Sequence, residues 1–386
     1  MSSDLKREYL KITKKRYLKA SKWEKKWILN EFCQTTGLYR KSAIRLLNRD
    51  TELKKRPGRK IIYAEETIRF LRRLWIQMNQ MCSKNMKAAL PLWLPFFDCP
   101  EETKTQLLAM SAATIDRKLK PFRSEIKRRS HSGTRPGYLR HVIPIKPLDF
   151  NVSGPGFVEA DTVAHCGGSL SGEFIWSLTF TDVYSGWTEN RAVFSKASYG
   201  VLEALKDIED KIPFSILAFN CDNGSEFLNH QLIRYFGPHG DKKRLNQLMT
   251  RSREYRKNDN CHVEQKNWTH VRELFGYDRF SDKKLVDIMN GIYKNEHNLL
   301  HNFFIPQMKL KTKLRTGAKY KRTYTKPQTP YQRLIECPGT PEDIKAKLTA
   351  TLTGLNPFEL RKKMQKKLKV FYKALTPDSD QIAEAA

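Results

Sequence analysis

The chain has 386 residues, enough for two to four domains and too many for one small core. Hydrophobic residues make up 39% of it and aromatic residues 11%, so the composition does not predict disorder. Lys and Arg number 71 against 41 Asp and Glu, a formal net charge of +30 that opposes folding unless a polyanion meets it. Nucleic acid is the expected polyanion. An anionic membrane surface fits less well, because the charge is spread along the chain.

Cysteine usage and hydropathy indicate an intracellular protein. The seven cysteines are scattered and odd in number, and no CxxC pair exists. This pattern supports neither a disulfide framework nor a paired-cysteine zinc site. The N-terminus lacks an apolar signal core, and no stretch approaches the length of a membrane span. We expect a soluble, cytoplasmic, nucleoid-associated protein without a membrane partner.

The first 60 residues carry 19 basic and 6 acidic side chains. Large apolar residues recur in them at helical spacing: Trp23, Trp27, Ile28 and Phe32. A turn at Gly37 and a short basic helix follow, which predicts a helix-turn-helix DNA-binding domain over residues 1–55. We expect three basic residues on its outward face to contact DNA: Arg40, Lys41 and Arg45. The alternative is an ordinary helical hairpin with a solvated basic face.

A basic segment broken by Pro and Gly, residues 54–60, is predicted to be a linker. A second helical domain is expected over residues 61–125. Near its end Ser111 is a candidate N-cap, and Arg117 and Lys118 are candidate DNA contacts on an exposed face. A second helix-turn-helix and a plain helical packing unit are equally compatible with this pattern. Residues 126–150, polar and then Pro-rich, mark a linker and domain boundary.

The pattern changes to alternating strands after residue 150. GFVEADTVAH is a strand candidate, and EFIWSLTFTD and ENRAVFSK are predicted to pair as a hairpin through a turn at residues 184–186. A helix and a buried strand follow, up to FNCDNG. This order predicts an α/β layer fold with helices packed on a mixed sheet.

Three carboxylates occupy chemically useful places in this predicted fold. Asp161 lies in the first strand, Asp222 follows an apolar strand at a Gly-containing turn, and Glu264 lies on a helix that Asp259 or Asn260 could cap. Taken singly, each has an ordinary interpretation: an edge charge, a turn residue and a solvated helix face. Phosphodiester chemistry by two divalent ions needs such oxygen ligands converging from separate elements. Together, in this order, they indicate a catalytic triad.

Other polar residues near these motifs have simpler explanations. We interpret Asp182 as a residue that forms the hairpin turn. We interpret Glu226 as a residue that supports the site by contacting its ligands and not the metal ions. The neighbouring pairs His165–Cys166 and Cys261–His262 are adjacent residues, a poor spacing for two ligands on one ion. Zinc is therefore not expected there, and His165 is interpreted as structural.

The segments VEADTVAH, CDNGSEF and NDNCHVEQKNWTHVR resemble the core of retroviral integrases and of the insertion-sequence transposases that share the RNase H-like fold. The resemblance covers residues 151–281. It implies a mixed five-stranded sheet and a polynucleotidyl transferase with two Mg²⁺ ions, for which Mn²⁺ would substitute. Asp161, Asp222 and Glu264 correspond to the catalytic and metal-binding residues, and Asn267 to the Asn that follows the Glu.

Two departures favour the insertion-sequence branch of the resemblance. Forty-one residues separate Asp222 from Glu264, more than is typical of retroviral integrases. We place the extra length in the polar loop 237–247. The His/Cys zinc domain at the retroviral N-terminus is also missing.

The last third, residues 282–386, is predicted to be a basic C-terminal region. A helix is expected over residues 284–304, and an amphipathic basic helix over 356–375 for subunit or DNA contact. Between them, Lys309 to Lys326 hold eight basic residues, no acidic ones and two tyrosines. Such runs are usually solvated, but this one also suits tracking of phosphates. We expect three of its residues to contact DNA: Lys319, Lys321 and Arg322.

These observations predict a multidomain chain: a helix-turn-helix N-terminal region, an α/β RNase H-like core and a basic C-terminal region. The predicted function is DNA strand cleavage and transfer on double-stranded DNA, at element ends and at a target. The resemblance implies a homo-oligomer assembled on DNA. A non-catalytic DNA-binding regulator derived from a transposase, and a nuclease without joining activity, are the alternatives.

Overall fold

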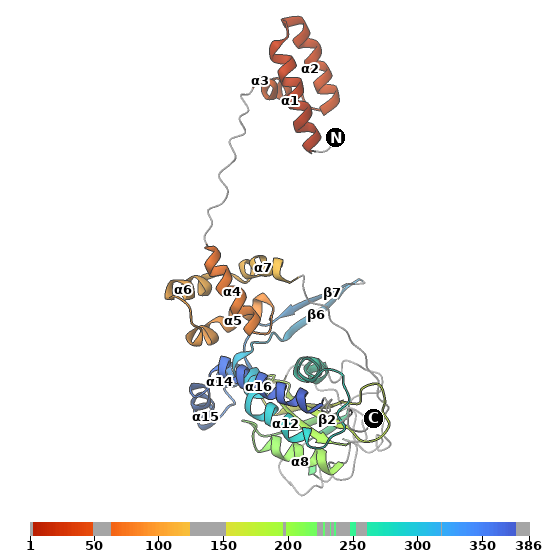
Figure 1. The fold of residues 1–386 in the computed structure, drawn as a ribbon, viewed down its shortest axis with the longest axis vertical. Helices are drawn as coiled ribbons and strands as arrows, with labels where there is room; N and C mark the ends of the chain where they lie inside the picture. Colours follow the sequence, from red (N-terminus) through yellow and green to blue (C-terminus); the bar gives the residue numbers. More distant parts are fainter. Residues whose placement is uncertain are drawn as a thin grey trace, which may run out of the picture. The chain divides into compact units, whose positions relative to one another are not determined.

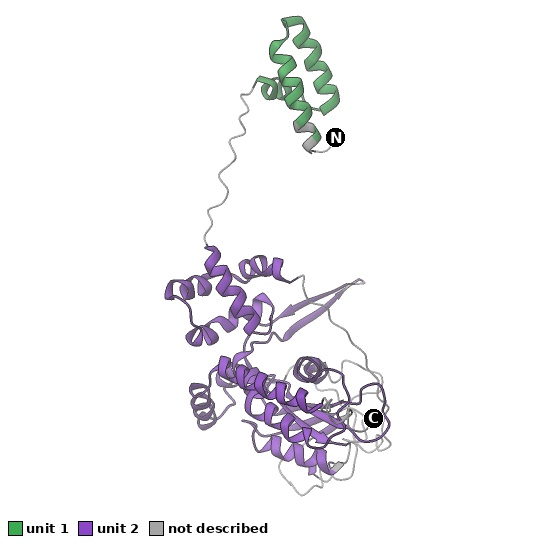
Figure 2. Ribbon diagram, in the orientation of Figure 1, with its two compact units in different colours: residues 1–62 green, residues 63–386 purple. Residues whose placement is uncertain are grey.

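The protein forms two compact units, residues 1–62 and 63–386 (Figures 1 and 2). The computed structural model describes residues 3–48, 63–123, 152–195, 198–221, 248–251, 261–317 and 319–375, with single positions at 227, 232, 235 and 236. The predicted linkers 54–60 and 126–150 and the polar loop 237–247 lie outside the described residues. Among the described helices, none combines the length and the apolar character needed to cross a membrane.

The first unit consists of three helices, α1 (Ser3–Lys19), α2 (Lys22–Thr36) and α3 (Arg40–Asn48) (Figure 1). The start of α2 is capped reciprocally, because the Ser21 hydroxyl accepts from the Glu24 N–H and the Glu24 carboxylate accepts from the Ser21 N–H. Gly37 ends α2 in the left-handed region at φ +69°, where glycine carries no Cβ penalty. A three-residue turn then leads into α3, as the sequence predicts.

The core of the first unit uses only part of the predicted apolar face. Ile28 and Phe32 are buried, but Trp23 and Trp27 are 75% and 73% exposed. The helical spacing of these four residues therefore does not place them all on one buried face. Periodicity finds apolar positions on a helix, but α1 and α3 pack against only one side of α2, and the two tryptophans lie on the other.

The second unit begins with helices α4 (Glu65–Gln77), α5 (Ser83–Trp93), α6 (Glu101–Ala109) and α7 (Ala112–Leu119), with 3₁₀ turns at Leu94–Phe96 and Lys120–Phe122. The predicted N-cap is confirmed, because the Ser111 hydroxyl accepts from the Thr114 N–H at 3.1 Å. Trp93 ties this block to the C-terminal helices. Its indole N–H donates to the Phe304 carbonyl, and its ring lies 5.0 Å from that of Phe358.

The sheet has five strands in the order β3-β2-β1-β4-β5. The strands are β1 (Phe157–Ala164), β2 (Ile175–Asp182), β3 (Thr188–Phe194), β4 (Ala218–Cys221) and β5 (Leu248–Arg251). Strands β1, β2 and β3 pair antiparallel, whereas β4 pairs parallel with β1 and with β5. The mixed five-stranded sheet that the resemblance implies is thus present.

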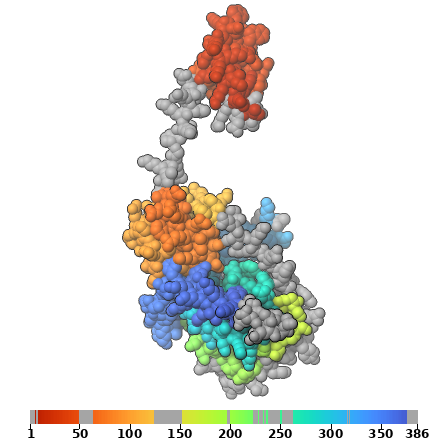
Figure 3. All heavy atoms as spheres, in the orientation of Figure 1, coloured from red at the N-terminus to blue at the C-terminus, as the bar shows by residue number. Residues whose placement is uncertain are grey.

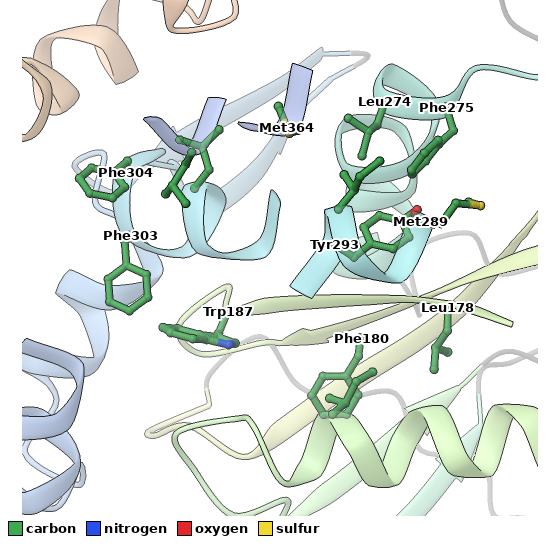
Figure 4. Close-up of a cluster of buried hydrophobic side chains, with 14 of the residues drawn as sticks. Leu178, Phe180, Trp187, Leu274, Phe275, Met289, Tyr293, Phe303, Phe304 and Met364 are labelled. Carbon is green, nitrogen blue, oxygen red and sulfur yellow. The ribbon is translucent and has the colours of Figure 1, made fainter. Parts of the chain in front are cut away.

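Helices cover both faces of the sheet. Helix α8 (Ser198–Glu209) lies on one side, and α12 (Leu285–Ile292) lies on the other (Figures 1 and 4). All eight residues of β2 are buried, including its polar members. In Figure 4 Leu178 and Phe180 point towards α8, while Tyr293 lies on the opposite side of the strands. The polar face of β2 is therefore inside the protein, where its groups need partners.

Two helical segments lie on the α12 side of the sheet, and the first has three parts. Helix α12 continues through the π-helical segment η5 (Tyr293–His297) into α13 (Asn298–Phe304). The helix expected over residues 284–304 is thus confirmed. A second segment in the same layer runs through α10 (Cys261–Lys266), the π-helical η4 (Asn267–Arg272) and α11 (Glu273–Phe275).

The C-terminal helices are α14 (Pro330–Glu336), α15 (Glu342–Thr353) and α16 (Pro357–Leu375). The helix expected over 356–375 exists as α16, but its apolar face is already used within the chain. Leu360, Met364 and Phe371 are buried, and the Phe371 ring lies about 5 Å from those of Phe275 and Phe280. The side of α16 left for other contacts is the basic one.

The basic run after α13 forms a two-stranded antiparallel hairpin, β6 (Leu310–Thr316) and β7 (Lys319–Tyr324). Every residue of β7 is exposed. In Figure 3 the light blue atoms of this hairpin stand out from the body of the second unit. Because both of its faces are exposed, the hairpin buries little apolar surface. It therefore lacks the hydrophobic packing that stabilises the five-stranded sheet.

Strand β3 lies at an edge of the five-stranded sheet, and asparagines of the helical layer bond its outward backbone. The Asn302 amide accepts from the Thr188 N–H and donates to the Thr188 carbonyl, both at 2.9 Å. Asn290 does the same for Ala192, at 2.8 and 2.9 Å. Each amide thereby replaces the neighbouring strand that this edge lacks.

Replacing Asn302 with Ala is expected to lower the free energy of unfolding by about 2–4 kcal/mol, because a buried N–H and a buried C=O lose their partners. Urea unfolding of the purified chain measures this change. The matched control is Asn295→Ala, an exposed asparagine on the same helical segment. Equal midpoints for the two variants would show that the Asn302 amide does not stabilise the edge strand.

Candidate active site

Asp161 lies near the middle of β1 and is half-buried. Its Oδ2 accepts a hydrogen bond from the Asn267 Nδ2 at 2.6 Å, and its Oδ1 accepts from the Thr162 N–H at 2.8 Å. The strand thus presents a carboxylate whose orientation is set by a side chain 106 residues away in the chain. The structure brings together two of the residues that the sequence predicts for the site.

Glu264 lies on α10, three residues before Asn267 on the same continuous helical segment. Residues three apart on a helix share a face, so Glu264 is on the side that carries the Asp161 contact. Its side chain is exposed. The carboxylate of Glu264 is therefore open to solvent, next to the half-buried Asn267–Asp161 pair.

Asp222 lies outside the described residues, as does Glu226. The described residue before it is Cys221, which ends β4. In the parallel register of β1 and β4, Cys221 is opposite Ala160, the residue before Asp161. Parallel strands end at the same edge of a sheet, so β4 leads the chain to the place where β1 presents its carboxylate.

Glu159 is a functional candidate that the sequence did not indicate. It is 2% exposed, and its Oε2 accepts from the backbone N–H groups of both His262 and Val263 at 3.0 Å. A carboxylate at a helix N-terminus satisfies free N–H groups and meets the positive end of the helix dipole. Glu159 is two residues from Asp161 and so shares its face of β1. The sequence could have indicated that Glu159 shares a face with Asp161. It could not indicate that the start of α10 would lie against Glu159.

The residues at this site fit a hard divalent cation. Asn267 Oδ1 is buried and has no hydrogen-bond partner within the part of the chain that the structure describes. An unpartnered buried oxygen beside a carboxylate is the kind of atom that a cation or its water satisfies. Carboxylate and amide oxygens are also the ligands that Mg²⁺ and Mn²⁺ prefer.

Lys266, on the same helix, is buried away from this exposed face. Burial, assisted by the positive charges of Arg333 and Lys309, lowers its pKa to about 7. Its ammonium donates to the Gln307 side chain. Lys266 thus gives up its proton close to neutral pH, so it contributes less than a full positive charge near the site.

His165 is fully buried, and its Nε2 lies 2.8 Å from the Ser177 hydroxyl. Its ring stacks on Phe280 at 4.8 Å, and burial, assisted by Arg272, lowers its pKa to about 3. A neutral, buried imidazole with these contacts supports the structural interpretation. His262 is also held neutral, since burial lowers its pKa to about 4.

The interpretation of Asp182 as turn chemistry is confirmed. Its carboxylate is buried and accepts from the Gly156 N–H and from both the N–H and the hydroxyl of Ser185. Burial raises the pKa of Asp182, and these hydrogen bonds lower it by less. Asp182 therefore organises the turn between β2 and β3.

The predicted DNA contacts lie on three separate elements. On α3, Arg40, Lys41 and Arg45 are all exposed. On α7, Arg117 is exposed and Lys118 is half-buried. On β7, the three predicted contacts are exposed: Lys319, Lys321 and Arg322. Their accessibility is compatible with DNA binding, which stays a prediction for each of them.

Comparison with known proteins identifies a relative that covers most of the chain. No protein-family model matches. The chain is 35% identical over 332 residues to the uncharacterized protein y4rM of Sinorhizobium fredii, a match that covers 82% of this chain and 91% of y4rM. The chain belongs to the y4rM family. Because y4rM itself is uncharacterized, this membership brings no activity with it.

Two solved structures are similar to this chain over part of its length. One is the catalytic core domain of BIV integrase, at 14% identity over 31% of this chain and 69% of that one, with a TM-score of 0.23. The other is a simian T-cell lymphotropic virus intasome in complex with PP2A regulatory subunit B56 gamma, at 15% identity over 61% and 86%, with a TM-score of 0.29. Both TM-scores are too low for either likeness to bear on fold or function.

Replacing Glu159 with Ala is expected to loosen the start of α10, because two buried backbone N–H groups lose a charged acceptor. The expected cost is about 2–4 kcal/mol in the free energy of unfolding of this segment. Hydrogen exchange of a peptide spanning residues 261–275 should accelerate. Glu173→Ala removes an exposed carboxylate just before β2 and serves as the control. Unchanged exchange in the Glu159 variant would contradict the capping role.

Proposed function

We propose that the chain is a metal-dependent polynucleotidyl transferase of the transposase and integrase type. Asp161, Asp222 and Glu264 are the proposed catalytic carboxylates. The observation that carries this proposal is the 2.6 Å hydrogen bond between Asn267 and Asp161, because it joins the first carboxylate strand to the helix of Glu264. The motif around Asp222 completes the set in sequence.

The arrangement suits phosphodiester chemistry for a physical reason. Ligands for such chemistry must come from separate rigid elements so that the ions, the attacking oxygen and the leaving oxygen stay aligned. Strand β1 supplies Asp161 and α10 supplies Glu264. Mg²⁺ ions, two per site with Mn²⁺ as a substitute, would supply Lewis acidity to the attacking and leaving oxygens. Asn267 would hold the Asp161 carboxylate in one orientation throughout.

DNA is the proposed substrate, since the net charge of +30 and the exposed basic hairpin both favour a polyanion. The hairpin register supports this in detail. Lys313 is opposite Arg322, an unfavourable pair of like charges unless phosphates neutralise it. The Tyr320 ring lies 5.0 Å from the Lys313 ammonium, on the same face as that pair. Lys319 and Lys321 face the other way, opposite Thr316 and Leu314.

Two other functions are considered. A DNA-binding regulator that has lost catalysis would not need an orienting bond to Asp161 or a capped helix for Glu264. A nuclease without joining activity would need both, and so differs from the proposal only in its products. Joining two DNA ends requires two active sites, so we also propose a homo-oligomer assembled on DNA.

The direct test incubates the full chain with Mg²⁺ and a labelled DNA fragment that carries its own gene and flanks. We expect new 3′ ends at defined positions together with joined products. Asp161→Asn, Asp222→Asn and Glu264→Gln should each lower both by roughly 10³-fold or more, as loss of a metal ligand does. Asp287→Asn, an exposed carboxylate on α12, is the matched control and should retain activity.

The three possible results separate the candidate functions. Cuts and joints that vanish in the triad variants support strand transfer. Cuts without joints, in Mg²⁺ and in Mn²⁺, would favour the nuclease. Tight DNA binding without cuts in any sample would favour the regulator and overturn the proposal.

The hairpin makes a separate prediction about affinity. Replacing Lys319, Lys321 and Arg322 with Gln should weaken binding to all DNA sequences alike and reduce the slope of log K against log salt by about 2–3, roughly one for each lost phosphate contact. Fluorescence anisotropy over a salt series measures the slope. The wild-type chain, measured over the same salt series, is the reference. A slope equal to that of the wild-type chain would remove the hairpin from the DNA interface.

A further inference from the structure

Three histidines meet between the two helical segments that cover one face of the sheet. His270 comes from η4, His297 from η5 and His301 from α13. One ring nitrogen of each lies within 4.8 Å of one from both of the others. The ring centroids are 5.1 Å apart for His270 and His297, 4.2 Å for His270 and His301, and 4.3 Å for His297 and His301.

His297 is the anomaly in this cluster. It is 2% exposed, and neither of its ring nitrogens has a hydrogen-bond partner within the described residues. A neutral imidazole has one N–H donor and one acceptor nitrogen, and leaving both unpaired in the interior is unfavourable. Such a group calls for a specific explanation, and an ion bound to the acceptor nitrogen is one.

His270 is oriented as metal-binding histidines are. Its Nδ1 lies 3.2 Å from the Asn190 Oδ1, and the Asn190 Nδ2 donates to the Thr179 hydroxyl at 3.0 Å. Because the amide nitrogen is used by Thr179, the amide oxygen faces His270 and accepts its Nδ1–H. The Nε2 of His270 then carries the lone pair. A second hydrogen bond that fixes the tautomer in this way is a regular companion of metal-bound histidine.

The spacing of the other two histidines is also suitable. His297 and His301 are four residues apart on one helical segment, the separation at which two helical side chains point the same way. Two histidines at this spacing with a third from another element are a known way of holding zinc. The π-helical form of η4 and η5 shifts the side chains from their α-helical places, as often happens at functional sites.

The neutral state of the histidines favours cation binding, whereas nearby basic side chains oppose it. Burial lowers the pKa of all three histidines, so their imidazoles are neutral and able to bind a cation. Lys266 near the cluster and Arg361 near His301 oppose a further positive charge. The opposition from Lys266 is reduced, since burial lowers its own pKa to about 7.

We propose that His270, His297 and His301 form a binding site for one divalent transition-metal ion, with Zn²⁺ as the preferred occupant. Imidazole nitrogen selects Zn²⁺ and its neighbours over Mg²⁺, so this site is chemically distinct from the carboxylate site. Tetrahedral Zn²⁺ with bonds of about 2.0–2.1 Å needs ligand nitrogens roughly 3.4 Å apart, and closing from 4.8 Å takes only small ring movements.

The site is structural and stands independently of the proposed DNA chemistry. His270 lies six residues after Glu264 on one continuous helical segment, and the other two histidines lie on the segment that packs on β3. An ion held by all three ties the helix of Glu264 to the rest of the helical layer. Its loss lowers the stability of that layer whether or not the chain cuts DNA.

The test uses the full chain with any affinity tag removed and with metals stripped by a chelator. We expect about one Zn²⁺ per chain after reloading and dialysis, measured by plasma mass spectrometry. Zn²⁺ at about a hundredfold over its Kd should raise Tm by roughly 4 °C. Co²⁺ in its place should give the visible absorption of a four-coordinate site with three imidazole nitrogens and one water as ligands.

Variants locate the ion. His297→Gln and His301→Gln, tested separately, should each lose the bound Zn²⁺ and the Co²⁺ spectrum. His165→Gln removes a buried histidine outside the cluster and should retain both, as should Asp161→Asn in the carboxylate site. A stripped wild-type chain that binds no Zn²⁺ overturns the proposal, and so does Zn²⁺ retained by both cluster variants.

Discussion

The buried carboxylate of Glu159 is the contact on which the candidate site depends. The backbone N–H groups of His262 and Val263, in the first turn of α10, donate hydrogen bonds to it. The helix therefore starts at a fixed point on β1. Two residues further along the strand, Asp161 receives the Asn267 amide. Strand and helix are thus joined at two points, and Glu264 lies between them in the helix. The position of an exposed carboxylate is set by two buried contacts on either side of it.

A second constraint is the polar layer between the sheet and the helices above it. Ser177 on β2 meets His165 and the Tyr293 hydroxyl, each at 2.8 Å. Thr179, two residues further on, is linked through Asn190 to His270. Hydrogen bonds of this kind between buried side chains favour one packing arrangement over others that an apolar interface would allow. The helical layer is therefore held in register with the sheet as well as covering it.

Much of this architecture is readable in the sequence, and the failures have physical causes. Alternation and turn residues predicted β1 to β4 and α8, and the turn role of Asp182 followed from its position. Strand β5 is four residues with no clear alternation, so only the resemblance implied it. The β6–β7 hairpin does alternate, but its high charge made it look like a solvated run.

Contacts between distant segments were beyond the sequence altogether. The helical spacing of Trp23 and Trp27 could not reveal which side of α2 its neighbours would cover. Glu159 and the histidine cluster pair residues far apart in the chain. The four-residue spacing of His297 and His301 was a visible signal, but only the fold adds His270. Local pattern therefore predicted elements and individual carboxylates, and packing decided what they touch.

The amides of Asn290 and Asn302 also determine how this protein can meet copies of itself. An exposed edge strand offers a template on which another chain can extend the sheet, in orderly dimers or in aggregates. At β3 the outward N–H and C=O groups of Thr188 and Ala192 are already bonded to side chains of the same chain. Sheet extension across two subunits is closed at that edge. Association of this chain with further copies of itself must therefore use other surfaces, and the edge offers no template for aggregation with unfolded chains.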